Sequence, residues 1–205
     1  MNEGYIKFQA EWEKSPPLPL KFFRRLNAWR KKLYDLGLIG VYADGIGYGN
    51  ISERFDKKGS FLITGSATGR FQDLTPSHYS LVSRVIFEEN RLVCHGPAIA
   101  SSESMSHAVI YRECPEISGV IHVHHKELWQ YLIHKVPTTD RSAEYGTPEM
   151  ARAISGLMQE TDLRISKIFV MAGHEEGIFS LGKSLDEAGE ILLQHFHQLT
   201  EGNNS

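Results

Sequence analysis

The sequence has few cysteines and no long apolar run. Cys94 and Cys114 are too few for a disulfide framework and are typical of a reducing compartment. No apolar segment approaches the roughly 18 residues that a membrane span needs. The first residues also lack the basic and apolar stretches of a signal peptide. We therefore expect a cytoplasmic protein with no membrane partner.

The sequence also lacks an excess of one charge. Its 22 Lys and Arg against 25 Asp and Glu give a net charge of −3, which offers no bulk attraction for nucleic acid. We therefore expect no nucleic-acid partner, and any partner must be recognised locally. With 205 residues, 41% of them hydrophobic, the chain favours one domain over residues 20–199, with an N-terminal extension over 1–19 and a polar tail over 200–205.

A first amphipathic helix is predicted between Phe22 and Leu36, where apolar residues recur at helical spacing until Gly37. The basic residues on its other face are expected to be solvated, because a charge run of this kind is usually an exposed face. These residues are Lys21, Arg24, Arg25, Arg30, Lys31 and Lys32.

Strands and helices then interleave irregularly. Turn residues predict two hairpins, 51–55 with 61–63 and 81–87 with 92–94. Ser101 or Ser102 is the expected N-cap of a helix that ends near Glu113. The remaining pattern predicts strands at 120–124, 167–171 and 177–181, and helices at 126–134, 147–158 and 184–199. The fold class is therefore α/β, a single domain whose mainly antiparallel central sheet is flanked by helices.

Histidines are conspicuous, with ten in the chain. His122 and His124 project from the same face of a predicted strand and can converge on one ion. A His-x-His triplet is weak evidence alone, since a chain of this length with ten histidines is expected to contain about 0.5 such triplets by chance. A turn between two later strands can bring His174 over the same sheet, and three neutral nitrogens would leave a coordination position open. The pair His195 and His197 lies in a predicted helix and cannot share a metal.

A carboxylate near this cluster is open to two interpretations. Glu103 opens a predicted helix, where the helix end favours its ionised form, and spacing alone favours a role toward the helix dipole. A cupin-like site would use Glu127 with the three histidines instead. It is the weaker alternative, because Glu127 falls in a predicted helix.

Several motifs in order resemble the class II aldolase/adducin family, in particular its fuculose-phosphate aldolase-like members. The likeness extends from about Leu20 to Leu199. The motifs are Gly49-Asn50-Ile51-Ser52, Leu62-Ile63-Thr64 followed by Thr68-Gly69, Ser101-Ser102-Glu103 with His107 and Tyr111, Val120-Ile121-His122-Val123-His124, Tyr145-Gly146-Thr147, and Gly173-His174 with Gly177.

The resemblance implies a three-layer fold and a zinc-dependent aldolase-like lyase of carbohydrate metabolism. By resemblance, His122, His124 and His174 bind Zn²⁺ or another divalent metal, and Glu103 is the catalytic acid/base. The enzyme would cleave a C–C bond in a small hydroxy-ketone, a sugar phosphate or related acid, through a zinc-stabilised enediolate. Family members are commonly homotetramers, so we expect a tetramer.

An anion pocket is also implied, built from backbone N–H groups, hydroxyls and a helix N-terminus that suit a phosphate or carboxylate. Its residues are Gly49, Asn50, Thr68, Gly69, Ser101 and Ser102. The loop from Thr64 to Gly69 is longer than the family's turn, so either Thr64-Gly65 or Thr68-Gly69 is the matching pair.

The sequence also allows other interpretations of its function. The same metal site suits a dehydratase or an epimerase, and the adducin head shows that the fold also serves as a non-catalytic interaction module. No residue matches the tyrosine that protonates the aldehyde product in aldolases. Tyr145, His107 and Tyr111 are interpreted as packing residues, and His125 as lying behind or outside the metal site.

Overall fold

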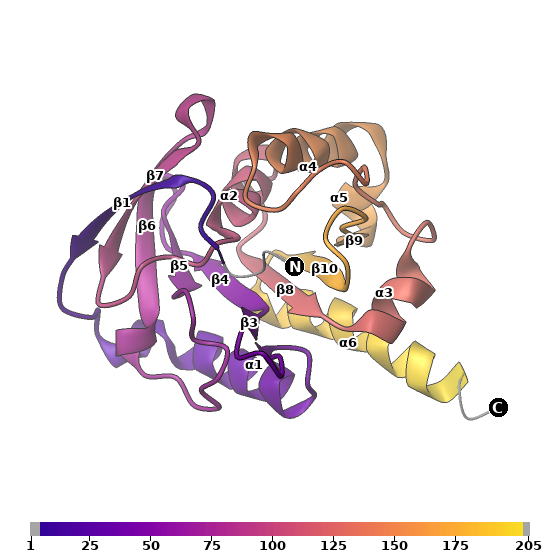
Figure 1. Ribbon diagram of the computed structural model, residues 1–205, viewed down its shortest axis with the longest axis horizontal. Coiled ribbons are helices and arrows are strands. Elements are labelled where there is room, and N and C mark those ends of the chain that lie inside the picture. Colours follow the sequence, from indigo (N-terminus) through magenta and orange to yellow (C-terminus); the bar gives the residue numbers. More distant parts are fainter. Residues whose placement is uncertain (1–4, 203–205) are drawn as a thin grey trace.

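An eight-stranded sheet forms the centre of the computed structural model, which describes residues 5–202 (Figure 1). The strand order is β1-β7-β6-β5-β4-β8-β10-β9, and all neighbours are antiparallel except β1 and β7. The strands are β1 Gln9–Lys14, β4 Asn50–Arg54, β5 Phe61–Thr64, β6 Tyr79–Ile86, β7 Arg91–Gly96, β8 Gly119–His124, β9 Ile168–Val170 and β10 Gly177–Gly182. A separate hairpin pairs β2 Gly40–Val41 with β3 Gly47–Tyr48.

Helices cover both faces of the sheet and make it the middle of three layers. Figure 1 shows α1 and α6 along one face and α2 and α4 along the other. The helices are α1 Arg24–Asp35, α2 Ser104–Glu113, α3 Lys126–Leu132, α4 Pro148–Glu160, α5 Leu163–Ser166 and α6 Leu185–Gly202, with 3₁₀ turns η1 Leu20–Phe22, η2 Pro76–His78 and η3 Phe87–Glu89. Within residues 5–202, no helix has both the length and the apolar character of a membrane span.

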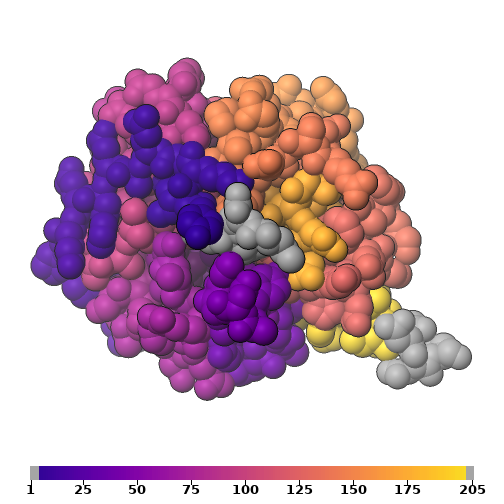
Figure 2. All heavy atoms as spheres, in the orientation of Figure 1, coloured from indigo at the N-terminus to yellow at the C-terminus, as the bar shows by residue number. Residues whose placement is uncertain are grey.

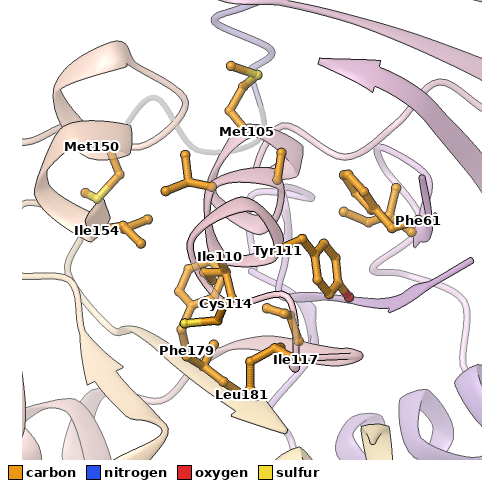
Figure 3. Packing of buried hydrophobic residues seen from close by; sticks show 14 of the residues in the cluster. Phe61, Met105, Ile110, Tyr111, Cys114, Ile117, Met150, Ile154, Phe179 and Leu181 are labelled. Carbon is orange, nitrogen blue, oxygen red and sulfur yellow. The ribbon is translucent and has the colours of Figure 1, made fainter. Parts of the chain in front are cut away.

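Two apolar clusters hold these layers together, one on each face. Alternation along β8 divides its residues between them, so that Val120 packs beneath α2 while Ile121 and Val123 pack against the α1 and α6 layer. The same alternation turns His122 and His124 to the α2 face. Figure 3 shows the cluster on that face, with α2 and α4 contributing labelled residues such as Ile110 and Ile154.

The predicted fold class is confirmed, and the predicted helices and strands are present with small shifts at their ends. The first residue of α2 is Ser104, so Glu103 is its N-cap and the expectation of Ser101 or Ser102 is wrong. The pattern did not predict β1, the β2–β3 hairpin or α5. Strand β1 lies within the expected N-terminal extension and pairs in parallel with β7.

The ends of the chain are only partly described. Residues 1–4, which bear on the expected absence of a signal peptide, and residues 203–205 of the expected tail lie outside the described residues. The first residues of that tail, 200–202, continue α6.

Candidate active site

The first part of the site lies on β8, near the middle of the sheet. His122 pairs with Asn50 on β4 and with Phe179 on β10, and its ring stacks on the Phe179 ring with centroids 4.3 Å apart. His122 and His124 are both buried. The sheet therefore fixes the backbone of His122 and His124 and places both imidazoles on one face, as the alternation in the sequence predicted.

The third histidine is placed by the turn between β9 and β10. Gly173 permits this turn, because a Cβ there would lie 2.2 Å from the carbonyl oxygen of Ala143. Gly177 has no room for a Cβ either, which would lie 2.7 Å from Cδ2 of His174 itself. These two glycines allow the turn to fold against its surroundings and carry His174 back over β8.

The three imidazoles meet at their Nε2 atoms. The Nε2 of His124 lies 3.0 Å from that of His122 and 3.1 Å from that of His174. A tetrahedral metal with bonds of about 2.0 to 2.1 Å separates its ligand atoms by about 3.3 Å, so these two separations are close to those of a bound set. All three ligand atoms lie within 4.8 Å of one another. The cluster His122, His124 and His174 can hold a metal ion.

The other ring nitrogens of His122 and His124 have partners that fit this use. Nδ1 of His122 lies 3.2 Å from the carbonyl oxygen of Ile178, and Nδ1 of His124 lies 2.8 Å from the hydroxyl of Tyr42. A proton on each Nδ1 satisfies these oxygens and leaves the Nε2 lone pairs for a metal.

Burial and neighbouring charges also keep the rings of His122 and His124 neutral. Burial lowers the pKa of His122 well below its usual range, and the neighbouring histidines lower it further. The pKa of His124 is lowered in the same way, first by burial and then by His174. Neutral imidazole is the form that binds metal, so the donor set suits a divalent cation.

Glu103 completes the group from the start of α2. Its Oε1 lies 3.6 Å from Nε2 of His174 and 4.0 Å from Nε2 of His122, while its Oε2 accepts a hydrogen bond of 2.9 Å from the hydroxyl of Ser106. The side chain is buried. Because Ser106 holds one oxygen, the other is directed at the histidine cluster.

Glu127 takes no part in this cluster. It lies on the exposed side of α3, so the cupin-like alternative is wrong. His125 caps α3 by accepting a hydrogen bond from the backbone N–H of Leu128 at 3.1 Å. His195 and His197 lie on α6, as the sequence predicted.

A small cavity adjoins Glu103 on the side of β4. Its lining includes all six residues that the resemblance assigned to an anion pocket, and it includes Gly65 but not Thr64 of the other candidate Thr-Gly pair. Its lining consists of Gly47, Gly49, Asn50, Gly65, Ser66, Ala67, Thr68, Gly69, Ser101, Ser102 and Glu103. We call this cavity the anion pocket, after the site that the resemblance implies.

The two Thr-Gly pairs differ in what their hydroxyls do. Thr64 accepts a hydrogen bond from the backbone N–H of Ile51 at 3.2 Å and belongs to the sheet. Thr68 lines the pocket and donates to the carbonyl of Gly65 at 2.8 Å. Gly69 has no room for a side chain, since a Cβ would lie 2.1 Å from the carbonyl oxygen of Gly40. Thr68 and Gly69 are therefore the pair that shapes the pocket.

Arg30 braces this loop and corrects the prediction of a fully solvated basic face on α1. Its side chain is buried, with 1% of its surface exposed. The guanidinium donates to the carbonyls of Gly69, Gln72 and Thr68 at 3.0, 3.1 and 3.2 Å. The other five basic residues of that face are exposed. Sequence periodicity could not separate Arg30 from its neighbours, because its partners belong to a distant loop.

Tyr42 is a second residue that the sequence did not indicate. Its hydroxyl lies between Nδ1 of His124 and the carboxylate of Glu176, to which it donates at 2.7 Å. Tyr42 comes from the β2–β3 hairpin and Glu176 from the same turn as His174. Figure 2 shows the face on which violet segments of the first part of the chain and orange segments that precede the yellow C-terminal helix both lie.

Tyr145 contacts the cluster through its ring, as expected of a packing residue. Its ring centroid lies 4.7 Å from that of His174. The ammonium group of Lys7 lies 4.1 Å from the Tyr145 ring centroid and forms an ion pair with Glu144 at 3.0 Å. Lys7, which precedes β1, thus contacts the Tyr145 ring, and that ring contacts His174 of the histidine cluster.

Comparison with known proteins identifies the family to which the fold belongs. The model of the family described as class II aldolase and adducin N-terminal domain matches residues 28–195. The chain belongs to this family. No curated protein matches the sequence.

Solved structures of the class II aldolase family share the fold at low sequence identity. An L-fuculose 1-phosphate aldolase is 20% identical, with a TM-score of 0.68 over 90% of this chain and 85% of that one. The L-fuculose-1-phosphate aldolase of Thermus thermophilus is 23% identical, with a TM-score of 0.60 over 90% of this chain and 97% of that one. YgbL of Klebsiella pneumoniae, suggested to be an aldolase, epimerase or decarboxylase, is 18% identical, with a TM-score of 0.64 over 89% of each chain.

Proposed function

We propose that this protein is a metal-dependent lyase that cleaves a C–C bond in a small hydroxy-ketone bearing a phosphate or carboxylate. One observation carries the proposal. Glu103 lines the anion pocket and at the same time places Oε1 within 4.0 Å of Nε2 of both His122 and His174. A substrate anchored by its anion would therefore present its reacting carbons between the carboxylate and the histidine cluster.

His122, His124 and His174 are the proposed metal ligands. A divalent cation held there, which we propose to be zinc, would polarise the substrate carbonyl and stabilise the negative charge that C–C cleavage produces. Neutral ligands suit this task, because they leave the full charge of the cation available. Tyr42 and the carbonyl of Ile178 would hold two of the rings in position through their Nδ1 atoms.

Glu103 is the proposed acid/base. In the cleavage, the hydroxyl loses its proton as its carbon becomes an aldehyde, and the electron pair of the broken C–C bond passes to the carbon beside the ketone, which must then receive a proton. The carboxyl group of Glu103 is positioned to deliver it and to remove it in the condensation direction. Ser106 keeps the side chain oriented by donating to Oε2.

The anion pocket would bind the phosphate or carboxylate of the substrate. Its glycines let a ligand approach the backbone N–H groups, and Ser101 and Ser102 add hydroxyl groups. Thr68, whose hydroxyl donates to the carbonyl of Gly65, shapes the loop that presents these groups. A phosphate placed there would adjoin Glu103. This arrangement favours a phosphorylated or acidic ketose over a neutral one.

Product analysis tests the proposal. Metal-loaded protein is incubated with phosphorylated and unphosphorylated ketoses and with small hydroxy-acids. A lyase releases two carbonyl fragments, whereas an epimerase or a dehydratase leaves the carbon chain intact. His122→Ala should abolish turnover and leave the folded domain intact, as circular dichroism would show. Protein that binds no metal and is unaffected by this change would instead be a non-catalytic interaction module.

The proposal also covers the oligomeric state, the cellular location and the domain boundaries of the protein. We propose a cytoplasmic homotetramer whose catalytic domain spans residues 20–199, after an N-terminal extension over 1–19 and before a tail over 200–205. Sedimentation equilibrium of the full chain measures the number of subunits directly. A monomer at micromolar concentration would contradict the tetramer.

A further inference from the structure

A chain of hydrogen bonds lies directly behind the anion pocket and connects it to α2. Nε2 of His107 lies 2.6 Å from Oδ1 of Asn50, and Nδ1 of His107 lies 2.7 Å from the hydroxyl of Ser52. The Ser52 hydroxyl in turn lies 2.7 Å from that of Tyr111. All four residues are buried. Of these, only Asn50 lines the pocket.

The two elements are matched to make this chain. Asn50 and Ser52 point to the same face of β4 because they are two residues apart. His107 and Tyr111 lie on the same face of α2 because they are four residues apart. Figure 3 shows Tyr111 leaving α2 on the side of Phe61, away from Met150 and Ile154. His107 and Tyr111 therefore have polar partners as well as a place in the packing.

The protons of the chain have two self-consistent arrangements. In the first, Tyr111 donates to Ser52, Ser52 donates to Nδ1 of His107, and Nε2–H donates to Oδ1 of Asn50. In the second, every bond is reversed, and the Asn50 amide donates to Nε2. Both arrangements need a neutral His107, and burial lowers its pKa to about 3.

The Tyr111 hydroxyl distinguishes the two arrangements. In the first, it donates across 2.7 Å to Ser52, which is the usual length of an O–H···O bond. In the second, the Ser52 hydroxyl donates to the Tyr111 hydroxyl. The proton of Tyr111 must then reach the carbonyl of Ser118 across 3.4 Å. The first arrangement is the stronger, because a hydroxyl proton across 3.4 Å makes only a weak bond.

We propose that His107 is a positioning residue that holds the Asn50 amide with its N–H groups turned into the anion pocket, and that Ser52 and Tyr111 fix which nitrogen of His107 carries the proton. Because Oδ1 is engaged by Nε2–H, the amide nitrogen is the group left to face a ligand. A phosphate or carboxylate then meets a donor, where a freely rotating amide would also present a carbonyl. This inference rests on the proposed function in one respect, namely that the ligand of the pocket is a phosphate or a carboxylate.

Binding of inorganic phosphate tests the proposal without any turnover. NMR titration of the full chain measures the affinity of the wild type, His107→Leu and His107→Gln. Leucine removes the donor to Asn50, so affinity should fall about tenfold or more. Glutamine carries an N–H group near the position of Nε2, so affinity should stay within about threefold. Ser180→Ala, a buried change on β10 outside the pocket, should leave affinity unchanged.

Two further measurements keep the test decisive if His107→Leu does not fold. Long-range ¹H–¹⁵N spectra should show His107 protonated at Nε2 and unprotonated at Nδ1 at about pH 7. Asn50→Asp keeps the acceptor for His107 and removes the N–H donors, so the spectrum should persist while phosphate affinity falls about tenfold or more.

Several results would overturn the proposal. They are a proton on Nδ1, equal losses in the leucine and glutamine variants, no loss in either, or a wild type that does not bind phosphate. Absence of lyase activity alone would contradict the proposed function. It would leave the phosphate affinities and the histidine spectrum as predicted.

Discussion

The Oε1 atom of Glu103 lies 3.6 Å from Nε2 of His174, although one residue caps α2 and the other belongs to the turn between β9 and β10. This contact joins the group proposed to move a proton to the group proposed to hold a metal. Glu103 also lines the anion pocket. One carboxylate therefore connects the two halves of the site, and its removal should affect turnover more than binding.

Glu103→Gln should lower kcat by about 10²- to 10⁴-fold, because the amide cannot exchange a proton with the reacting carbon. Metal content and phosphate affinity should stay close to those of the wild type. The control is Glu127→Gln, on the exposed side of α3. Steady-state kinetics with metal analysis checks both variants. Full activity in Glu103→Gln would assign the proton to another group.

Gly173→Ala should weaken metal binding about tenfold or more, since the new Cβ would lie 2.2 Å from the carbonyl oxygen of Ala143 and force the turn that carries His174 to move. Gly156→Ala is the matched control, because it lies within α4 with open space around its Cα. That change should stabilise the fold by about 0.5 to 1 kcal/mol. Competition with a metal chelator measures the affinities, and equal affinities in both variants would contradict this account of the turn.

Arg30→Met should lower the free energy of unfolding by about 2 to 4 kcal/mol, because the carbonyls of Thr68, Gly69 and Gln72 lose a buried donor. Phosphate affinity should also fall as the pocket loop loosens. Lys31→Met removes a neighbouring exposed charge and should change stability by less than about 0.5 kcal/mol. Urea unfolding compares them. Similar small effects would mean that the loop holds its shape without Arg30.

The stability of the metal-free protein should rise with pH between about 3 and 6.5. Burial lowers the pKa of His107 from 6.5 to about 3 in the folded state, so the unfolded chain binds an extra proton in this window. His107 thus contributes a slope of at most about 1.4 kcal/mol per pH unit, and acidification through the window destabilises the fold.

The comparison with His107→Gln isolates this contribution, because the other histidines titrate in both proteins. Urea unfolding at several pH values between about 4.5 and 7.5 gives the two slopes. The wild type should show the steeper dependence and the variant a flatter one. Identical slopes would mean that His107 takes up its proton equally in the folded and unfolded states.

The sequence predicted the parts of the site that follow from local periodicity. Alternation along β8 places His122 and His124 on one face, and the two strands predicted on either side of His174 place that residue in a turn. Glu103 is different, because a carboxylate at a helix start also suits the helix dipole. Only the resemblance of its motif to a known family favoured a catalytic role.

The residues that escaped prediction depend on contacts between distant segments. Arg30 follows the polar period of α1, and its buried state comes from carbonyls in the loop at 68–72. Tyr42 belongs to a hairpin whose strands have two residues each, too short for a periodic signal. His107 was interpreted as packing, because helical spacing gives no information about the strand that faces it.

The central claim is that His122, His124 and His174 hold one divalent ion beside Glu103. Anomalous diffraction from zinc-loaded crystals, recorded at the zinc absorption edge, tests it most directly. The account predicts one strong peak per chain, about 2.0 to 2.1 Å from the Nε2 atoms of all three histidines. A peak bound by other residues, or no peak at the three rings, would contradict it.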